Sequence, residues 1–168
     1  MGELFGNLCH IFFVKVIVVA AAGNYGNNRP TLFPANHPNV FSVGALNIYN
    51  KPAALTPSCD IDVYAPGTKI AAPLVHKDIH DGMEITQGTS CATPAIAGLV
   101  ALKIQFEKNK HELLKDVNKD FYVQEILRGE NIHFQDMKKM FDDMADAKRP
   151  HVLDPYKYFK VTCRLNIE

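Results

Sequence analysis

Residues 14–23 read VKVIVVAAAG, a run rich in β-branched side chains that ends at a glycine. A short apolar run that stops at a turn residue is typical of a strand buried on both faces, as strands of parallel sheets are. Three further short strands are expected downstream, separated by stretches rich in Gly, Asn and Pro: 40–45, 61–65 and 69–72. The pattern predicts an α/β fold in which helices flank a parallel sheet.

Two helices are expected after these strands. The first runs from about Ser90 to Lys108 and is apolar nearly all round, which predicts a central buried helix. The second belongs to a charged helical C-terminal segment and carries apolar residues on one face: Phe134, Met137, Phe141 and Met144. We interpret that stripe as core contact.

The chain of 168 residues is long enough for one domain with a real core. Its formal net charge is zero, which argues against a nucleic-acid partner and against binding to an anionic membrane. The charges are uneven, because residues 1–102 hold 11 of them and residues 103–168 hold 25. We expect reduced thiols at the widely spaced cysteines: Cys9, Cys59, Cys91 and Cys163.

The apolar stretch 11–22 has features of a signal peptide, but Glu3 and no Lys or Arg precede it. The stretch is also too short to span a membrane. The sequence therefore leaves the cellular compartment unknown.

Two motifs carry chemistry: Ala21-Ala22-Gly23-Asn24 after the buried strand, and Gly88-Thr89-Ser90-Cys91-Ala92-Thr93-Pro94 at the start of a helix. With these motifs the sequence resembles the subtilisin-like serine proteases, the subtilase family. The second motif fits the family's nucleophile signature at each fixed position. Three more segments resemble sequences of this family and occur in the same order as in the family: 33–35, 40–45 and 62–67.

The resemblance implies a partial subtilisin-like fold and a serine endopeptidase that cleaves polypeptides through an acyl-enzyme. Ser90 would be the nucleophile, and Asn24 and the Ser90 backbone N–H would bind the oxyanion. Substrate-binding positions would be Ala21, Ala22, Gly23, Gly88 and Thr89, with 32–35 near the base of the side-chain pocket. Residues 1–106 would be part of the catalytic domain, and 107–168 partly an insertion and partly the family's C-terminal helix.

The family's catalytic Asp and His motifs are absent from this sequence, and no histidine is followed by Gly. We therefore expect the chain alone to be inactive and to need the missing N-terminal half of the domain or a partner chain. Family members are often secreted or vacuolar. The alternative function is a non-catalytic pseudoprotease or interaction module.

Other sites are disfavoured by the sequence. A dinucleotide loop at 23–26 fails the G-x-G-x-x-G pattern. Cys91 is better explained as a buried thiol than as a nucleophile. Calcium is used by many subtilases, but the acidic residues here lack ligand spacing and are expected to be solvated: Asp60, Asp62, Asp78, Asp81 and Glu84. We expect neither metal nor cofactor.

Overall fold

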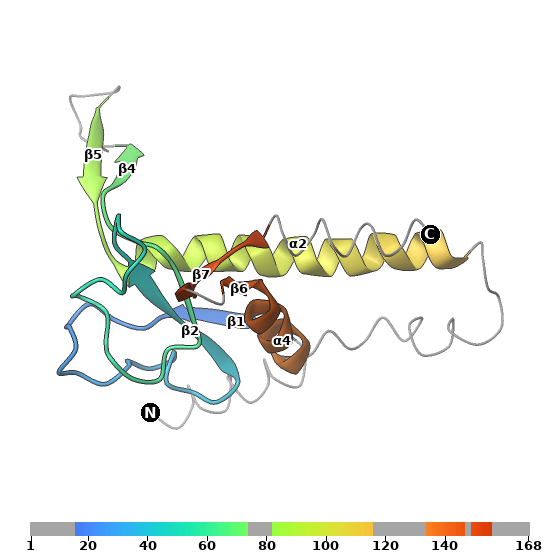
Figure 1. Cartoon of the computed structure of the whole chain (residues 1–168), viewed down its shortest axis with the longest axis horizontal. Coiled ribbons are helices and arrows are strands. Elements are labelled where there is room, and N and C mark those ends of the chain that lie inside the picture. The colour runs from blue at the N-terminus through green and yellow to red at the C-terminus, as the bar shows by residue number, and fades with distance from the viewer. Residues whose placement is uncertain (1–15, 74–81, 116–133, 147–148, 156–168) are drawn as a thin grey trace.

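The computed structural model describes residues 16–73, 82–115, 134–146 and 149–155. Seven strands and two helices make up this part of the chain (Figure 1). Their bounds are β1 Val18–Ala21, β2 Val40–Leu46, β3 Val63–Pro66, β4 Ile70–Pro73, β5 Met83–Thr86, α2 Thr89–Lys115, α4 Phe134–Met144, β6 Ala145–Asp146 and β7 Arg149–Leu153.

The central sheet has three parallel strands in the order β1-β2-β3. Ala21 pairs with Val43, and Leu46 pairs with Pro66, so the carboxyl ends of all three strands lie at one edge of the sheet. All seven residues of β2 are buried, as expected for the middle strand. The α/β class and the parallel sheet are confirmed.

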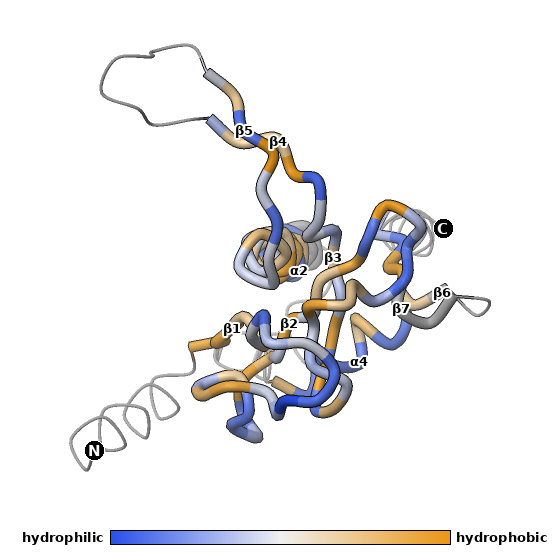
Figure 2. Tube along the Cα trace, turned by 90° about the vertical axis from the view of Figure 1, so that its left-hand side faces the viewer, coloured by the Kyte–Doolittle hydropathy of each residue, from blue (hydrophilic) through white to orange (hydrophobic). Residues whose placement is uncertain are grey.

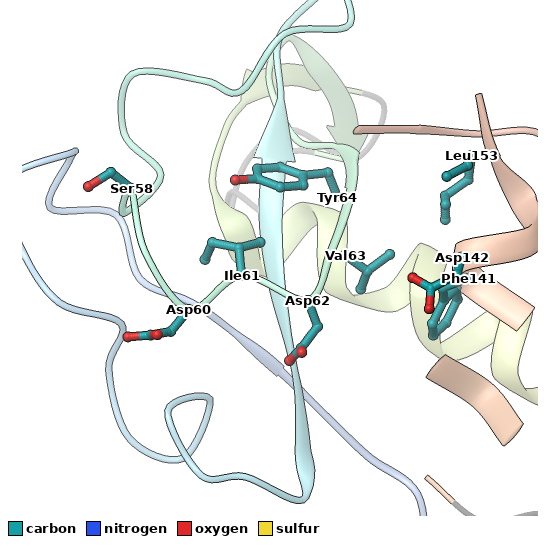
Figure 3. Close-up of a pocket in the computed structure, with 10 residues that line it drawn as sticks. Ser58, Asp60, Ile61, Asp62, Val63, Tyr64, Phe141, Asp142 and Leu153 are labelled. Carbon is teal, nitrogen blue, oxygen red and sulfur yellow. The ribbon is translucent and has the colours of Figure 1, made fainter. Parts of the chain in front are cut away.

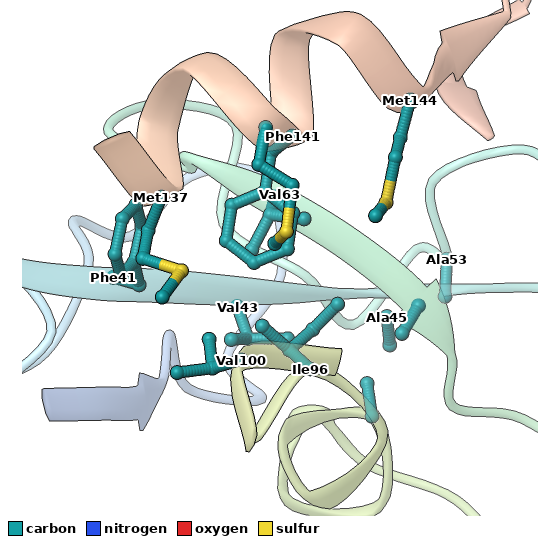
Figure 4. Packing of buried hydrophobic residues seen from close by; sticks show 13 residues of the cluster. Phe41, Val43, Ala45, Ala53, Val63, Ile96, Val100, Met137, Phe141 and Met144 are labelled. Carbon is teal, nitrogen blue, oxygen red and sulfur yellow. The ribbon is translucent and has the colours of Figure 1, made fainter. Parts of the chain in front are cut away.

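The core lies where β2 meets the two helices (Figure 4). Phe41 stacks on Phe134 with ring centroids 4.1 Å apart and meets Phe141 edge-on at 5.3 Å. Of the predicted apolar stripe of α4, Met137, Phe141 and Met144 are buried and Phe134 is partly buried against the core, while Met140 is a buried position that was not predicted. Methionine side chains suit this contact between α4 and the sheet because they are flexible and fill irregular gaps.

The prediction of an all-round buried helix at α2 was wrong. Ile96 and Val100 are buried in the core, but Leu102 is 57% exposed. The parallel sheet lies against one side of α2 (Figure 2), and the exposed residues of its first half include Ala97, Ala101 and Leu102. By length and composition alone Thr89–Asn109 could cross a membrane, and 22% of its 18-residue apolar window is buried inside the protein.

Two further expectations need correction. The strand expected at 69–72 is β4, but it pairs antiparallel with β5 in a separate ribbon that projects away from the parallel sheet (Figure 1). The helix expected to end near Lys108 continues to Lys115, because residues 107–115 have good helix formers and no Pro or Gly. Residues 116–131 of the expected insertion lie outside the described residues.

Candidate active site

The site lies at the edge of the sheet where the three parallel strands end. β1 leads directly into Ala22, Gly23 and Asn24. From the other side, the Gly88 N–H donates to the carbonyl of Gly67, the residue that follows β3, at 2.8 Å. The two motifs, more than 60 residues apart in the sequence, are joined directly by hydrogen bonds of Thr89 to Gly23 and Asn24. In open α/β sheets this carboxyl edge is where ligands commonly bind.

Thr89 fixes the orientation of the Asn24 amide. The Thr89 backbone N–H donates to Asn24 Oδ1 at 2.8 Å, and the Thr89 hydroxyl lies 3.1 Å from the same oxygen. Because a backbone N–H can donate only to an acceptor, this contact assigns the oxygen to one end of the amide and the Nδ2 group to the other. The Thr89 hydroxyl also accepts from the Gly23 N–H at 3.2 Å, and Thr89 is 1% exposed.

Gly88 keeps a small space open between Asn24 and Ser90. A Cβ on Gly88 would lie 3.0 Å from Ser90 Oγ and 3.3 Å from Asn24 Nδ2. Ser90 is exposed at the first turn of α2, where the helix dipole and free N–H groups favour negative charge. Within the described part of the chain, neither Asn24 Nδ2 nor the Ser90 N–H has a hydrogen-bond acceptor. Both donors are therefore free to meet an anionic oxygen beside Ser90 Oγ.

The predicted substrate-binding residues lie beside this space. Ala21 ends β1, Ala22 is fully buried, and the Ala22 carbonyl accepts from the Leu32 N–H at 3.0 Å. Gly23 has a φ of +112°, and a Cβ there would lie 3.0 Å from the Leu32 side chain. The contact places the expected base segment 32–35 against Gly23, while the roles of these residues stay predictions.

A base for Ser90 is not evident among the residues that the structure describes. His37 precedes β2 and therefore lies at the amino edge of the sheet, opposite Ser90, where its Nδ1 accepts from the Asn39 N–H. His111 lies 21 residues along α2 from Ser90, about 30 Å at the rise of an α-helix. The side chain of His151 in β7 is not described, and four histidines lie outside the described residues: His10, His76, His80 and His133.

Away from the space beside Ser90, a pocket of about 310 Å³ lies between β3 and α4 (Figure 3). Asp60, Asp62 and Asp142 line it, but no group of three or more potential metal ligands is found in the described part of the chain. Asp62, expected to be simply solvated, accepts from both the N–H and the hydroxyl of Ser42 at 2.9 Å. Burial raises the pKa of Tyr64 in the same pocket. These contacts brace β3 against β2.

Two other outcomes concern single residues. Cys91 is a half-buried free thiol, less enclosed than predicted. Gly67 was not predicted as part of the site, although a Cβ on it would lie 2.6 Å from the Ala45 Cβ and 2.8 Å from the Gly88 carbonyl. The Pro66-Gly67 pair at the strand end was the available signal, and it indicates the close approach of two backbones.

The sequence model of the subtilase family matches residues 6–145. A cuticle-degrading serine protease of Orbilia oligospora is 37% identical over 95 residues, which are 56% of this chain and 22% of that protein. Subtilisin E of Bacillus subtilis is 37% identical over 91 residues, 52% of this chain and 23% of that protein. The chain thus spans about a quarter of the length of the curated relatives it matches.

Solved structures with the same fold include the prenylagaramide maturation protease PagA, with a TM-score of 0.65 and 22% identity, over 95% of this chain and 55% of that one. The self-cleaved protease domain of PatA gives a TM-score of 0.63 and 24% identity, over 95% of this chain and 54% of that one.

Proposed function

Because the chain belongs to the subtilase family, we propose that it forms part of a serine endopeptidase domain, with Ser90 as nucleophile and Asn24 Nδ2 as oxyanion donor. The observation that carries this proposal is the Thr89 N–H to Asn24 Oδ1 hydrogen bond, which turns Nδ2 toward the space beside Ser90 Oγ. Loss of one such donor costs about 10²- to 10³-fold in rate in a subtilisin.

The proposed reaction is acyl transfer to water. Ser90 Oγ attacks the carbonyl carbon of a peptide bond, and the negative charge collects on the carbonyl oxygen between Asn24 Nδ2 and the Ser90 N–H. The C–N bond then breaks, the amine leaves with a proton, and water hydrolyses the resulting ester. The first step needs a base to take the hydroxyl proton, since a neutral serine is a weak nucleophile.

We propose that this base is supplied by a polypeptide segment that packs on β1 and α2. β1 is an edge strand of the sheet as described, and its four residues are only half-buried. The exposed residues in the first half of α2 are apolar or small as well, among them Ala97, Ala101 and Leu102. An unpaired strand edge beside an exposed apolar helix is a surface that proteins normally cover. A membrane is a poorer partner, because Ile96 and Val100 pack in the protein core.

The test is intact mass spectrometry after treatment with a fluorophosphonate probe. The chain is prepared alone and together with the polypeptide encoded upstream of it, each with a Ser90→Ala control. We expect one probe adduct per chain in the longer form, none in its control, and none in the chain alone. Asn24→Leu in the longer form should slow labelling about 10²- to 10³-fold.

The remaining outcomes are equally informative. Ser90-dependent labelling of the chain alone would show that a base lies within it, and the proposal of a completing segment would be wrong. No labelling in either form would favour a non-catalytic pseudoprotease or interaction module.

A further inference from the structure

A groove of about 670 Å³ begins at Asn24 and continues over the carboxyl edge of the sheet. Its walls come from the segments that follow β1, β2 and β3 and from Gln87, the residue before Gly88. It therefore opens from the proposed oxyanion site, and a polypeptide bound at Ser90 would pass close to it.

The groove is held in shape by hydrogen bonds from backbone N–H groups. The Gly26 N–H donates to the Leu55 carbonyl at 2.8 Å and ties the segment after β1 to the segment after β2. Asn47 Oδ1 accepts from the Tyr49 and Lys51 N–H groups and closes the tip of the second segment into a tight turn. Such a groove needs little ordering when a ligand binds.

The lining combines apolar surface with a single charge. Ala53, Ala54 and Leu55 supply an apolar side, while Tyr25 and Tyr49 stand at 72% and 74% exposure. Exposed tyrosines offer a large contact area at small entropic cost. Lys69 is the charged residue of the lining, and no ion pair or hydrogen bond of its ammonium group is found among the described residues.

The residues that line the groove include no Asp or Glu, and the one acidic residue in strands β4 and β5, which follow Lys69, is Glu84, which lies opposite Ala72. Residues 16–59 contain no Asp or Glu, and neither do residues 63–77. Asp60 and Asp62 lie at the start of β3 and hence at the amino edge of the sheet. A carboxylate entering the groove would therefore meet Lys69 without repulsion from an acidic residue of the lining.

We propose that this groove binds part of the polypeptide substrate and that Lys69 is a specificity-determining residue that favours a Glu or Asp side chain there. The proposal rests on the proposed protease function and adds to it a substrate class, polypeptides with an acidic residue close to the cleaved bond. Tyr25 and Tyr49 would contact apolar side chains of the bound part of the substrate.

The experiment measures peptide binding to the Ser90→Ala chain by fluorescence anisotropy, so that no cleavage is required. The probes are fluorescein-labelled octapeptide mixtures in which one position is fixed as Glu or as Gln, and that position is moved along the peptide. At one position we expect the Glu mixture to bind about two- to five-fold tighter, as for a solvated ion pair. The preference should weaken as salt is added.

Variants assign the preference to Lys69. Lys69→Gln should abolish it, and Lys69→Glu should reverse it in favour of a mixture with Lys at that position. Lys108→Met removes another exposed lysine, on α2, and should leave the preference for Glu unchanged. Circular dichroism checks that each variant is folded. A Glu preference that survives in Lys69→Gln, or no binding of any mixture, would overturn the proposal.

The two proposals can fail separately. Labelling of Ser90 in the longer form together with an unchanged peptide preference in Lys69→Gln would leave the protease function standing and remove the groove. A Lys69-dependent preference without any labelling would mean that the groove recognises acidic polypeptides in a protein that does not cleave them.

Discussion

α4 and α2 both contribute side chains to the core, but they differ in how much of their apolar surface the described residues bury. α4 is short and amphipathic, and its four buried side chains account for its apolar face. α2 is 27 residues long, and Ile96, Val100 and their neighbours use only one side of it. The other side keeps apolar residues such as Leu102 in the open. The sequence of α2 is therefore suited to more protein than the described residues provide.

The largest effect that tests this comparison is expected at Phe141. Phe141→Ala should lower the free energy of unfolding by about 3–5 kcal/mol, because it removes a buried ring in contact with Phe41. Leu102→Ala should change it by less than about 0.5 kcal/mol, since Leu102 is exposed and Ala is a good helix former. Urea unfolding measures both. A comparable loss at the two positions would mean that α2 is already covered on its outward side.

The sequence predicted features that depend on local periodicity better than features that depend on packing partners. The Phe and Met stripe of α4 predicted its own burial because periodicity reports one face of a helix. The apolar character of α2 predicted burial all round, which the described structure does not show, because composition does not reveal which partners are present. The strand 69–72 was found, but its antiparallel pairing with β5 was not, because pairing joins segments that are separated in the sequence and no local pattern reports it.

In the candidate site, too, local motifs were predicted and contacts between distant segments were not. The Asn24 and Ser90 motifs were recognisable because each has fixed neighbours in the sequence. The contact of Gly67 with Gly88 and the groove around Lys69 depend on pairing between segments far apart in the chain. No local spacing in the sequence reports such pairing.

A smaller effect sharpens the distinction between the two sides of α2. Ile96→Val should lower the free energy of unfolding by about 0.5–1.5 kcal/mol, because Ile96 is fully buried and loses one methylene group. The same substitution at Ile85 of β5, which is 69% exposed, serves as the control and should have no measurable effect. Equal effects at both sites would contradict the assignment of Ile96 to the packed side.

The smallest change in the free energy of unfolding is expected at Lys103, which lies between the buried and the exposed side of α2. Lys103 Nζ pairs with Glu107 Oε1 one turn later, and the Lys103 side chain is 12% exposed. The lysine precedes the glutamate, which is the weaker order for such a pair along a helix. Lys103→Met should therefore cost about 0.3–0.5 kcal/mol in the free energy of unfolding at low salt.

That loss should be absent for Lys108→Met, since no ion pair of Lys108 is found within the described ranges. It should also disappear in 1 M NaCl, where the screening length falls to about 3 Å. A loss of about 2 kcal/mol or more that persists in salt would place Lys103 in a dry environment. That outcome would contradict the expectation that the pair behaves as a solvated one.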